Sequence, residues 1–374
     1  MSGSIFGKQF QISTWGESHG AGVGVIIDGC PAGLSLTEED IQQYLNRRKP
    51  GQSKYTTPRK ESDLVKILSG TFEGKTTGTP LSLMVENTNQ HSKDYSVLAN
   101  CYRPGHADYT FDQKYGFRDY RGGGRSSGRE TIGRVAAGAV AAKLLKEFGI
   151  QFITYTSAIG PVEIDSNQID LKEIGNNALF MPDATAAKKA SLYLEDCIAK
   201  KDSAGGIITG IIKGVPAGIG EPVFDKLDAK LAQAIFSIGA VKGFEIGDGF
   251  DVSKANGSTN NDAFCVDEQG KITKATNHAG GILGGISDGS DICFRVAIKP
   301  TPSIASLQKT VTADGKETEL SVQGRHDPVI VPRAVVVVEA MAALTLADLL
   351  LVNSSATLKH LHDIYDSSST ASMK

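Results

Sequence analysis

Residues 16–33, GESHGAGVGVIIDGCPAG, decide the fold because this stretch occurs twice in the chain. Residues 201–218, KDSAGGIITGIIKGVPAG, align with it without a gap and are identical at eight of the eighteen positions. Each copy joins a glycine-containing turn to a short apolar segment, and a helix is expected after each, at 37–48 and at about 224–237. The duplication predicts two similar halves, about 1–150 and 151–352, packed as one domain, with a tail at 353–374 that frays.

One difference between the two copies points to chemistry. The first copy has ESHG at residues 17–20, and the second has DSAG at residues 202–205. The acidic residue, the serine and the glycine recur, which indicates that the turn needs them for its shape. Because alanine replaces histidine in the second copy, the fold does not require the imidazole. His19 is therefore a candidate for proton transfer near neutral pH.

A glycine-rich segment, GGGRSSGRE at residues 122–130, is the second feature that suggests function. Adjacent glycines can expose consecutive backbone N–H groups, which favours anion binding. Ser127 followed by Glu130 predicts a capping box, and the apolar run after it predicts a helix over 131–147. Arginine is concentrated here, at positions 103, 118, 121, 125, 129 and 134. The segment predicts an anion site at a helix N-terminus, although a tight turn before a core helix with solvated arginines would give the same pattern.

The composition indicates a globular protein that binds small anions. The chain has 374 residues, of which 40% are hydrophobic and 22% charged, with a formal net charge of -3. Because the positive charge is local, small anions are better candidate ligands than nucleic acid. Five cysteines lie far apart without a C-x-x-C pair, so we expect no disulfide framework, no zinc site and a reduced, cytoplasmic location. We expect no leader and no membrane span, because no segment approaches eighteen uninterrupted apolar residues.

Further candidate residues lie in loops. His106 occurs in RPGHAD at residues 103–108, between a glycine and an arginine-rich segment. His326 and Asp327 precede a long apolar helix expected at about 332–351, where they could be catalytic or could cap the helix. The glycine-rich segment lacks the Lys-Ser/Thr of a nucleotide-binding P-loop, and no Rossmann pattern surrounds it. These residues suit a phosphorylated, carboxylated small molecule, with a phosphate-bearing cofactor as a further possibility.

Six motifs spread from residue 10 to about 350 resemble the chorismate synthase family. They are GESHG at 16–20, RPGHAD at 103–108, DYRGGGRSS at 119–127, GDGF at 247–250, NHAGG at 277–281 and GRHDP at 324–328. The resemblance implies an α+β fold, a β-α-β sandwich with central helices between antiparallel sheets, and a homotetramer. It also implies a carbon–oxygen lyase that converts 5-enolpyruvylshikimate 3-phosphate to chorismate by 1,4-anti elimination of phosphate and a ring proton. That family requires reduced FMN without net redox change.

The same resemblance implies a role for each site residue. His19 would be the acid near the departing phosphate, His106 would lie by the reduced flavin, and Asp327 would act near flavin N5 and help to take up the substrate proton. Substrate anions would be bound by Arg48, Arg129, Arg134 and Arg333. FMN contacts would come from Arg48, Lys54, Arg125, Ser126, Ser127, Gly239, Ala240, Gly284, Lys299, Pro300, Thr301, Pro302, Ser303 and Arg325. Many relatives carry arginine where this chain has Lys54, so a bidentate contact is not expected there.

Two other function classes fit part of the pattern. A flavin-dependent oxidoreductase would need a hydride donor site and net oxidation of its flavin. A non-enzymatic anion-binding or nucleic-acid-binding protein would need an extended basic stripe and steep salt dependence. Neither explains why one copy of the repeat carries histidine and the other does not. NADPH is a possible reductant for the flavin, although the compact length favours an outside source of electrons.

Overall fold

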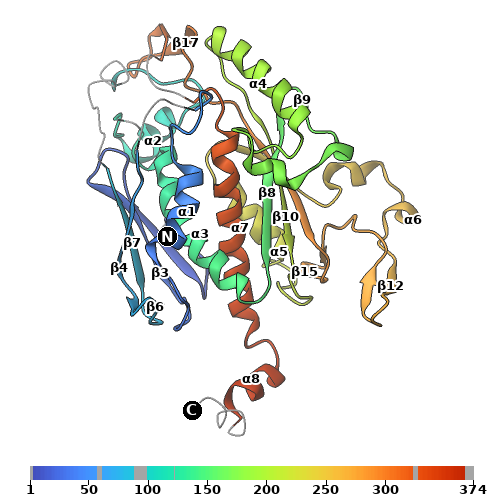
Figure 1. Cartoon of the computed structure of the whole chain (residues 1–374). Helices are drawn as coiled ribbons and strands as arrows, with labels where there is room; N and C mark the ends of the chain where they lie inside the picture. The colour runs from blue at the N-terminus through green and yellow to red at the C-terminus, as the bar shows by residue number, and fades with distance from the viewer. Residues whose placement is uncertain (1–2, 57–60, 88–98, 122, 323–326, 367–374) are drawn as a thin grey trace.

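The computed structural model describes residues 3–56, 61–87, 99–121, 123–322 and 327–366. In this part of the chain two five-stranded antiparallel sheets lie on either side of a layer of helices (Figure 1). The first sheet has the order β1 (Ile5–Phe6), β2 (Gln11–Gly16), β3 (Gly22–Asp28), β7 (Leu81–Glu86) and β4 (Val65–Ser69). The second has the order β9 (Val162–Glu163), β8 (Gln151–Ile159), β10 (Gly206–Lys213), β16 (Ile292–Ile298) and β11 (Val241–Ile246). The expected α+β sandwich is confirmed.

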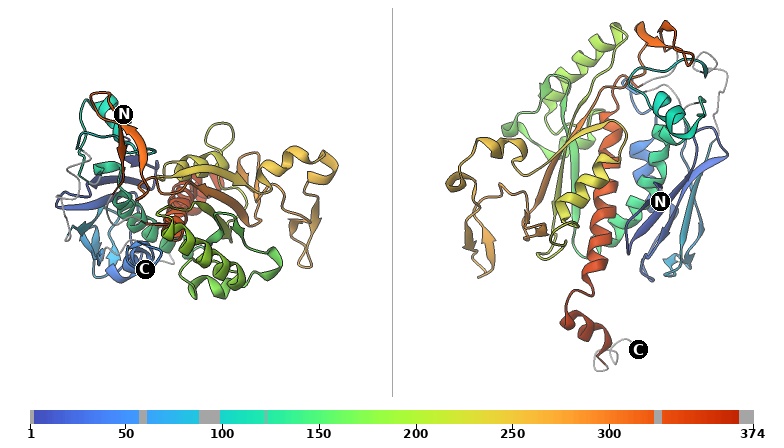
Figure 2. Two further views of the ribbon diagram at one scale, coloured as in Figure 1. Left: turned by 90° about the horizontal axis from the view of Figure 1, so that it is seen from above. Right: turned by 180° about the vertical axis from the view of Figure 1, so that it is seen from behind.

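The two halves share one connectivity. The first runs β2, β3, α1 (Glu38–Arg48), β4, β7 and α3 (Thr131–Lys146), and the second runs β8, β10, α5 (Leu227–Phe236), β11, β16 and α7 (Val331–Asn353). In each half the repeated sequence forms the central strand, β3 or β10, which pairs with equivalent neighbours on both sides. The views from above and from behind show the same succession of sheet, helices and sheet (Figure 2). The expected internal duplication is therefore present in the topology.

Helices α3 and α7 cross in contact at the centre of the molecule. A methyl group at Gly138 of α3 would lie 2.3 Å from Cβ of Ala340 in α7, so only glycine permits this approach. One turn earlier, a methyl group at Gly133 would lie 2.9 Å from the carbonyl oxygen of Gly24 in β3. Small residues thus bring α3 close to both its partners, and they fix the position of the segment that precedes α3.

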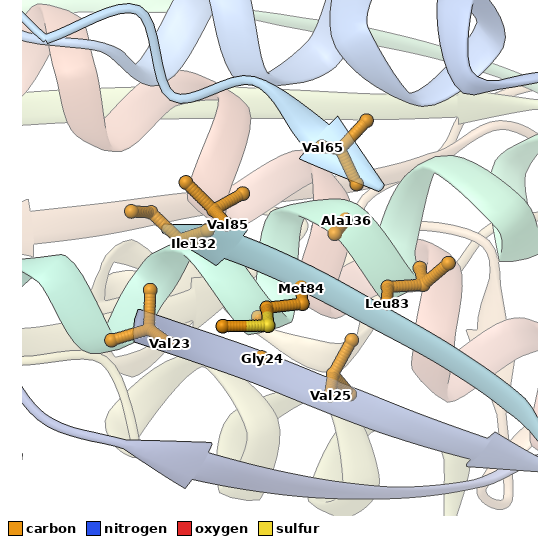
Figure 3. A pocket seen from close by; sticks show the side chains of 10 residues that line it. Val23, Gly24, Val25, Val65, Leu83, Met84, Val85, Ile132 and Ala136 are labelled. Atoms are coloured by element: carbon orange, nitrogen blue, oxygen red, sulfur yellow. The ribbon is translucent and has the colours of Figure 1, made fainter. Parts of the chain in front are cut away.

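The side chains between the first sheet and α3 are apolar. Figure 3 shows this seam, in which Val23, Val25, Leu83 and Val85 of the sheet face Ile132 and Ala136 of the helix. None of its lining residues carries a polar side chain. The seam is therefore core packing, and it offers a polar substrate no hydrogen-bonding side chain.

Helix α7 is apolar on nearly all sides, as the sequence predicts. It is the helix among the described residues that is long and apolar enough to cross a membrane, but 83% of its apolar window is buried inside the molecule. Burial between the two sheets accounts for its composition without a membrane. Helices α1 and α5 lie beside this central pair, one in each half (Figure 1).

The remaining elements lie around this core. They are β5 (Thr71–Phe72), β6 (Lys75–Thr76), α2 (Asp108–Tyr115), α4 (Ala184–Ala199), α6 (Gly257–Asn260), β12 (Phe264–Val266), β13 (Ile272–Lys274), β14 (Ile282–Leu283), β15 (Ile286–Ser287), β17 (Gln308–Val311), β18 (Glu317–Leu320) and α8 (Leu358–Tyr365). The prediction that the tail frays from residue 353 is wrong for α8. Thr357 caps this helix by accepting a hydrogen bond from the backbone N–H of His360 at 3.1 Å, and apolar residues recur at helical spacing.

Candidate active site

A buried network of charged side chains joins α1 to the turn before α3. Arg48, the last residue of α1, donates from Nη1 to Oδ2 of Asp63 at 2.7 Å and from Nε to Oγ1 of Thr131 at 3.0 Å. Arg129 donates from Nη1 to Oδ1 of the same aspartate at 3.1 Å and also pairs with Glu61. Asp63 thus bridges two predicted substrate-binding arginines, and its side chain is 0% exposed. Burial lowers the pKa of Arg48 to about 10, which leaves it charged at neutral pH.

Residue-by-residue interpretation of the sequence missed Glu61 and Asp63. Their roles follow from a physical requirement, because a buried guanidinium needs a buried counter-charge. The sequence feature that could have indicated them is the pair of carboxylates at residues 61 and 63, in the segment after α1. The clustered arginines would need such counter-charges. Asp63 adopts a φ of 47°, a conformation that non-glycine residues rarely hold, so the surrounding packing must fix it.

The start of α7 joins the same network. Arg333 donates from Nη1 to Oδ2 of Asp327 at 2.6 Å and from Nε to the carbonyl oxygen of Arg48 at 3.0 Å. Arg47 forms a bidentate pair with Glu339 of α7, at 2.8 and 2.7 Å. The structure thereby brings Asp327, Arg333, Arg48 and Arg129 together. Arg325 and His326 lie outside the described residues.

The turn that carries His19 lies beside Arg125. Arg125 donates to Oγ1 of Thr14 at 2.6 Å and to the carbonyl oxygen of Gly16 at 3.1 Å, so it holds the strand end that precedes the turn. His19 is half-buried, with Nδ1 3.2 Å from Oγ of Ser18. Although burial opposes it, the hydrogen bond from Arg121 holds the pKa of Asp119 below its usual range, and His19 adds to this effect. His19 is therefore close enough to Asp119, in the segment before the glycine-rich turn, to act on its charge.

The expected capping box at Ser127 and Glu130 is wrong. Ser127 caps a short 3₁₀ turn, where its hydroxyl accepts from the backbone N–H of Arg129 at 3.3 Å, and α3 begins only at Thr131. The carboxylate of Glu130 instead accepts from Nε of Arg134 at 2.7 Å and from Oγ1 of Thr14 at 3.0 Å. The two partners hold this carboxylate away from the helix N-terminus, because charge pairing to an arginine outweighs a neutral cap.

Arg134 extends the cluster to the second half of the chain. Its Nη1 donates to Oγ of Ser237, just after α5, at 2.5 Å. The predicted cofactor residues Gly239 and Ala240 follow directly in sequence, and the carbonyl oxygen of Ala240 accepts from the backbone N–H of Lys299 at 2.9 Å. Contacts therefore connect Arg134 at the start of α3, through Ser237 and Ala240, to Lys299.

The loop with His106 packs on the glycine-rich turn and on the segment that begins at Lys299. A methyl group at Gly123 would lie 3.2 Å from Cε1 of His106, so the imidazole lies directly against the turn. Lys299 donates from Nζ to the carbonyl oxygen of Gly105 at 2.7 Å, and a methyl group at Gly105 would lie 3.1 Å from Cβ of Pro302. The loop is thus held between two predicted cofactor-binding segments.

The other predicted cofactor residues divide into two groups. Ser126 and Ser127 form the turn beside His106, where Oγ of Ser126 donates to the carbonyl oxygen of Gly123 at 2.7 Å. Pro300, Thr301 and Ser303 continue from Lys299, and the carbonyl oxygen of Thr301 accepts from the second copy of the repeated turn. The second group, Gly284 and Lys54, lies apart from this cluster.

Gly284 and Lys54 are not brought to the cluster within one chain. The carbonyl oxygen of Gly285 accepts from the N–H of Leu227, which places Gly284 at the start of α5, while Ala240 follows its end. The ten residues of α5 separate these two positions by about 15 Å. Lys54 extends to the surface, where Nζ lies 2.5 Å from Oε1 of Glu195 in α4. An exposed ion pair of this kind contributes little stability, and the anion contact at Lys54 stays a prediction.

No group of three or more histidine, cysteine, aspartate or glutamate side chains among the described residues could hold a metal ion. The candidate site combines cationic side chains, hydroxyl groups and two imidazoles from distant parts of the sequence. It can bind several anionic groups of one small molecule and move a proton at either imidazole.

Comparison with known proteins shows the family of this chain. Residues 10–351 match the family model described as chorismate synthase. The chain is 68% identical to chorismate synthase of Lachnoclostridium phytofermentans over 98% of its own length and 100% of the relative. It is 54% identical to chorismate synthase of Methanosarcina mazei, over 93% of this chain and 96% of the relative. A crystal structure of chorismate synthase superposes with a TM-score of 0.76 at 31% identity, covering 98% of this chain and 99% of the other. The chain belongs to the chorismate synthase family.

Proposed function

We propose that this chain is a carbon–oxygen lyase that converts 5-enolpyruvylshikimate 3-phosphate to chorismate and phosphate, and thereby serves aromatic amino acid biosynthesis. The observation that carries the proposal is the gathering of four arginines around the N-termini of α3 and α7. The arginines are Arg48, Arg129, Arg134 and Arg333. Asn87 links Arg129 to the turn that carries His19, and His106 lies against the glycine-rich turn before α3. The proposed substrate carries one phosphate and two carboxylates, and guanidinium groups donate paired hydrogen bonds to anions of both kinds.

The reaction needs two events at opposite ends of one conjugated system. The carbon–oxygen bond to phosphate breaks, a ring carbon loses a proton, and the electrons of that C–H bond become a new carbon–carbon double bond. His19 is assigned to the departing phosphate, to which it delivers a proton, so that the leaving group gains a neutralising charge. Asp327, paired with Arg333 at 2.6 Å, is assigned to the side from which the ring proton leaves.

The residues present fit a cofactor that has a phosphate and a flat ring system. Arg125, Lys299, Ser126 and Ser127 supply cationic and hydroxyl donors, and a methyl group at Gly239 would meet nothing within 4 Å, which leaves backbone open there. When bound, reduced FMN lends electron density as the carbon–oxygen bond weakens and recovers it afterwards. His106 is assigned to that ring system as a hydrogen-bond donor.

The source of electrons, the assembly and the location are further parts of the proposal. The chain is proposed to receive reduced FMN from outside, although NADPH remains the reductant to test. A homotetramer in the cytoplasm follows from the family resemblance, with the substrate and cofactor as small-molecule partners. No nucleic acid or membrane partner is included, because the arginines point into one compact cluster and pair with buried carboxylates.

Phosphate release under strict anaerobiosis tests the function. The protein is mixed with 5-enolpyruvylshikimate 3-phosphate and chemically reduced FMN, and parallel samples contain oxidised FMN, with or without NADPH. We expect one phosphate per chorismate with reduced FMN, a flavin spectrum that is still reduced at the end, and no release with oxidised FMN alone. Stoichiometric oxidation of the flavin by substrate would instead indicate an oxidoreductase. Binding without release in any sample would indicate an anion-binding protein.

A further inference from the structure

An arginine in the loop before α2 and the aspartate that begins this helix lie on either side of one nitrogen of His106. Arg103 and Asp108 are both buried, and they bond to one another three times within this loop. The backbone N–H and Nε of Arg103 donate to Oδ2 of Asp108 at 3.0 and 2.8 Å, and Nη2 donates to Oδ1 at 2.7 Å. Although burial opposes ionisation, the hydrogen bonds from Arg103 hold the pKa of Asp108 well below its usual range. The pair is therefore ionised and rigid.

His106 contacts both members of this pair through Nδ1. The distance from Nδ1 to Nη2 of Arg103 is 3.0 Å, and the distance to Oδ1 of Asp108 is 3.2 Å. Nη2 of arginine carries two hydrogens and accepts none, so one can bond to Asp108 and the other to His106. When the second hydrogen bonds to His106, Nδ1 of the neutral imidazole accepts it and the ring proton lies on Nε2. If His106 gains a second proton, Nδ1–H can donate to Asp108 without a movement of the ring.

We propose that Arg103 and Asp108 are positioning residues that hold neutral His106 as its Nε2–H tautomer and keep the ring in one orientation in both protonation states. The inference rests on the proposed function only for what His106 does next, because the tautomer itself is a property of the free protein. An Nε2–H group is what a neutral histidine needs in order to donate a hydrogen bond to a ligand beside the glycine-rich turn.

The two charged groups beside His106 act on its protonation in opposite directions. A positive charge on Arg103 opposes protonation of Nδ1, and a negative charge on Asp108 favours it. The glycine-rich turn presents uncharged Gly123 to the ring, and Lys299 approaches the loop at the carbonyl oxygen of Gly105. Removing either member of the pair must therefore move the pKa of His106 in a direction that is set by the charge that remains.

Nitrogen-15 NMR of the histidine-labelled full-length protein tests the tautomer directly. The His106→Gln variant identifies the resonances of His106, and the wild-type spectrum above the titration midpoint reports which nitrogen carries the proton. We expect protonated Nε2 and unprotonated Nδ1. A neutral ring with its proton on Nδ1 would overturn the proposal, and so would fast exchange between both tautomers. This measurement needs no flavin and no turnover, so it fails or succeeds independently of the proposed function.

Two variants that each remove one charge and keep a polar side chain test the opposing charges. Asp108→Asn leaves Arg103 positive and should lower the pKa of His106, whereas Arg103→Gln leaves Asp108 negative and should raise it, each by about one unit or more. Arg295→Gln, which breaks a surface pair with Glu245, is the matched control and should leave the midpoint unchanged. Shifts of the same sign in both variants, or no shift, would show that the pair only supports the loop. If one variant fails to fold, the sign in the other still decides.

Discussion

The two copies of the repeated turn have the same connectivity but different surroundings. In the first copy, His19 is half-buried next to Ser18, and the side chain of Asn87 closes the turn by donating to the carbonyl oxygens of Glu17 and Gly20, each at 2.8 Å. In the second copy, Ala204 is only 2% exposed. Its N–H donates to the carbonyl oxygen of Pro328 at 2.9 Å, and it forms a parallel bridge with Val329.

The difference assigns separate tasks to the two turns. The second turn supports the segment before α7 and, through Ser203, the segment after Lys299, because Oγ of Ser203 donates to the carbonyl oxygen of Thr301 at 2.7 Å. Both of those segments hold predicted site residues. One copy therefore presents the histidine that is predicted to transfer a proton, and the other copy fixes the backbone on which further predicted site residues lie. The repeated sequence gives both turns the same connectivity. The burial of Ala204 and the partial exposure of His19 distinguish what each turn can do.

The largest expected effect comes from making the first turn resemble the second. In His19→Ala, turnover should fall about 100- to 10,000-fold, the range expected for loss of a positioned acid. The melting temperature should stay near that of the wild type, because the second copy folds with alanine at this position. Steady-state rates at saturating substrate and thermal melts check both parts. A normal kcat with a raised KM would assign His19 to binding alone.

The reverse exchange should damage stability. In Ala204→His, an imidazole would have to enter a buried position next to the strand-like contact with Val329, which should cost about 1–3 kcal/mol. Urea unfolding followed by circular dichroism measures the change, with His19→Ala as the comparison. Equal free energies of unfolding for both variants would mean that the two turns are interchangeable and that burial does not distinguish them.

A smaller difference is expected between Ser18 and Ser203, which occupy equivalent positions in the two turns. Ser203→Ala removes the hydrogen bond to Thr301 and should lower the free energy of unfolding by about 1 kcal/mol. Ser18→Ala removes the hydroxyl 3.2 Å from Nδ1 of His19, so its main effect should be on turnover. Parallel unfolding and rate measurements separate the two. Loss of turnover in Ser203→Ala that equals the loss in Ser18→Ala would contradict the division of tasks.

The smallest effect is expected where the two copies are equivalent. Cys30 and Val215 occupy corresponding positions, and each is 2% exposed. Cys30→Val should therefore change stability by less than about 1.5 kcal/mol. Burial raises the pKa of the Cys30 thiol to about 11, so the native protein should resist alkylation at this position at pH 8, while exposed Cys265 reacts. Mass spectrometry after brief alkylation locates the modified thiol, and rapid modification of Cys30 would contradict its burial.

The sequence predicts the architecture well because the repeat is local information. Eight identities in eighteen positions, followed each time by a helix, were enough to expect two similar halves, and strands β3 and β10 take equivalent places in their sheets. The composition of α7 likewise required burial on all sides. The tail helix α8 was missed because a Thr cap and a few spaced apolar residues were outweighed by the serines that follow.

The candidate site was less predictable because its contacts join distant residues. The sequence indicates which arginines gather, but Asp63 and Glu61 pair with Arg129 from more than sixty positions away, and no local pattern specifies those partners. The expected cap at Glu130 failed for the same reason, since its carboxylate pairs with Arg134 and Thr14. Gly284 shows the converse, because the family resemblance predicts a cofactor contact for it while α5 separates it from Ala240.

Amide hydrogen exchange in the two turns tests the division of tasks most directly. Exchange at residues 16–22 and 201–206 is measured in the free protein and in the presence of 5-enolpyruvylshikimate 3-phosphate with reduced FMN under anaerobic conditions. We predict that the first turn exchanges faster when free and slows markedly with ligands, whereas the second turn is already protected and does not change. Equal slowing of both turns, or slowing of the second alone, would contradict the account.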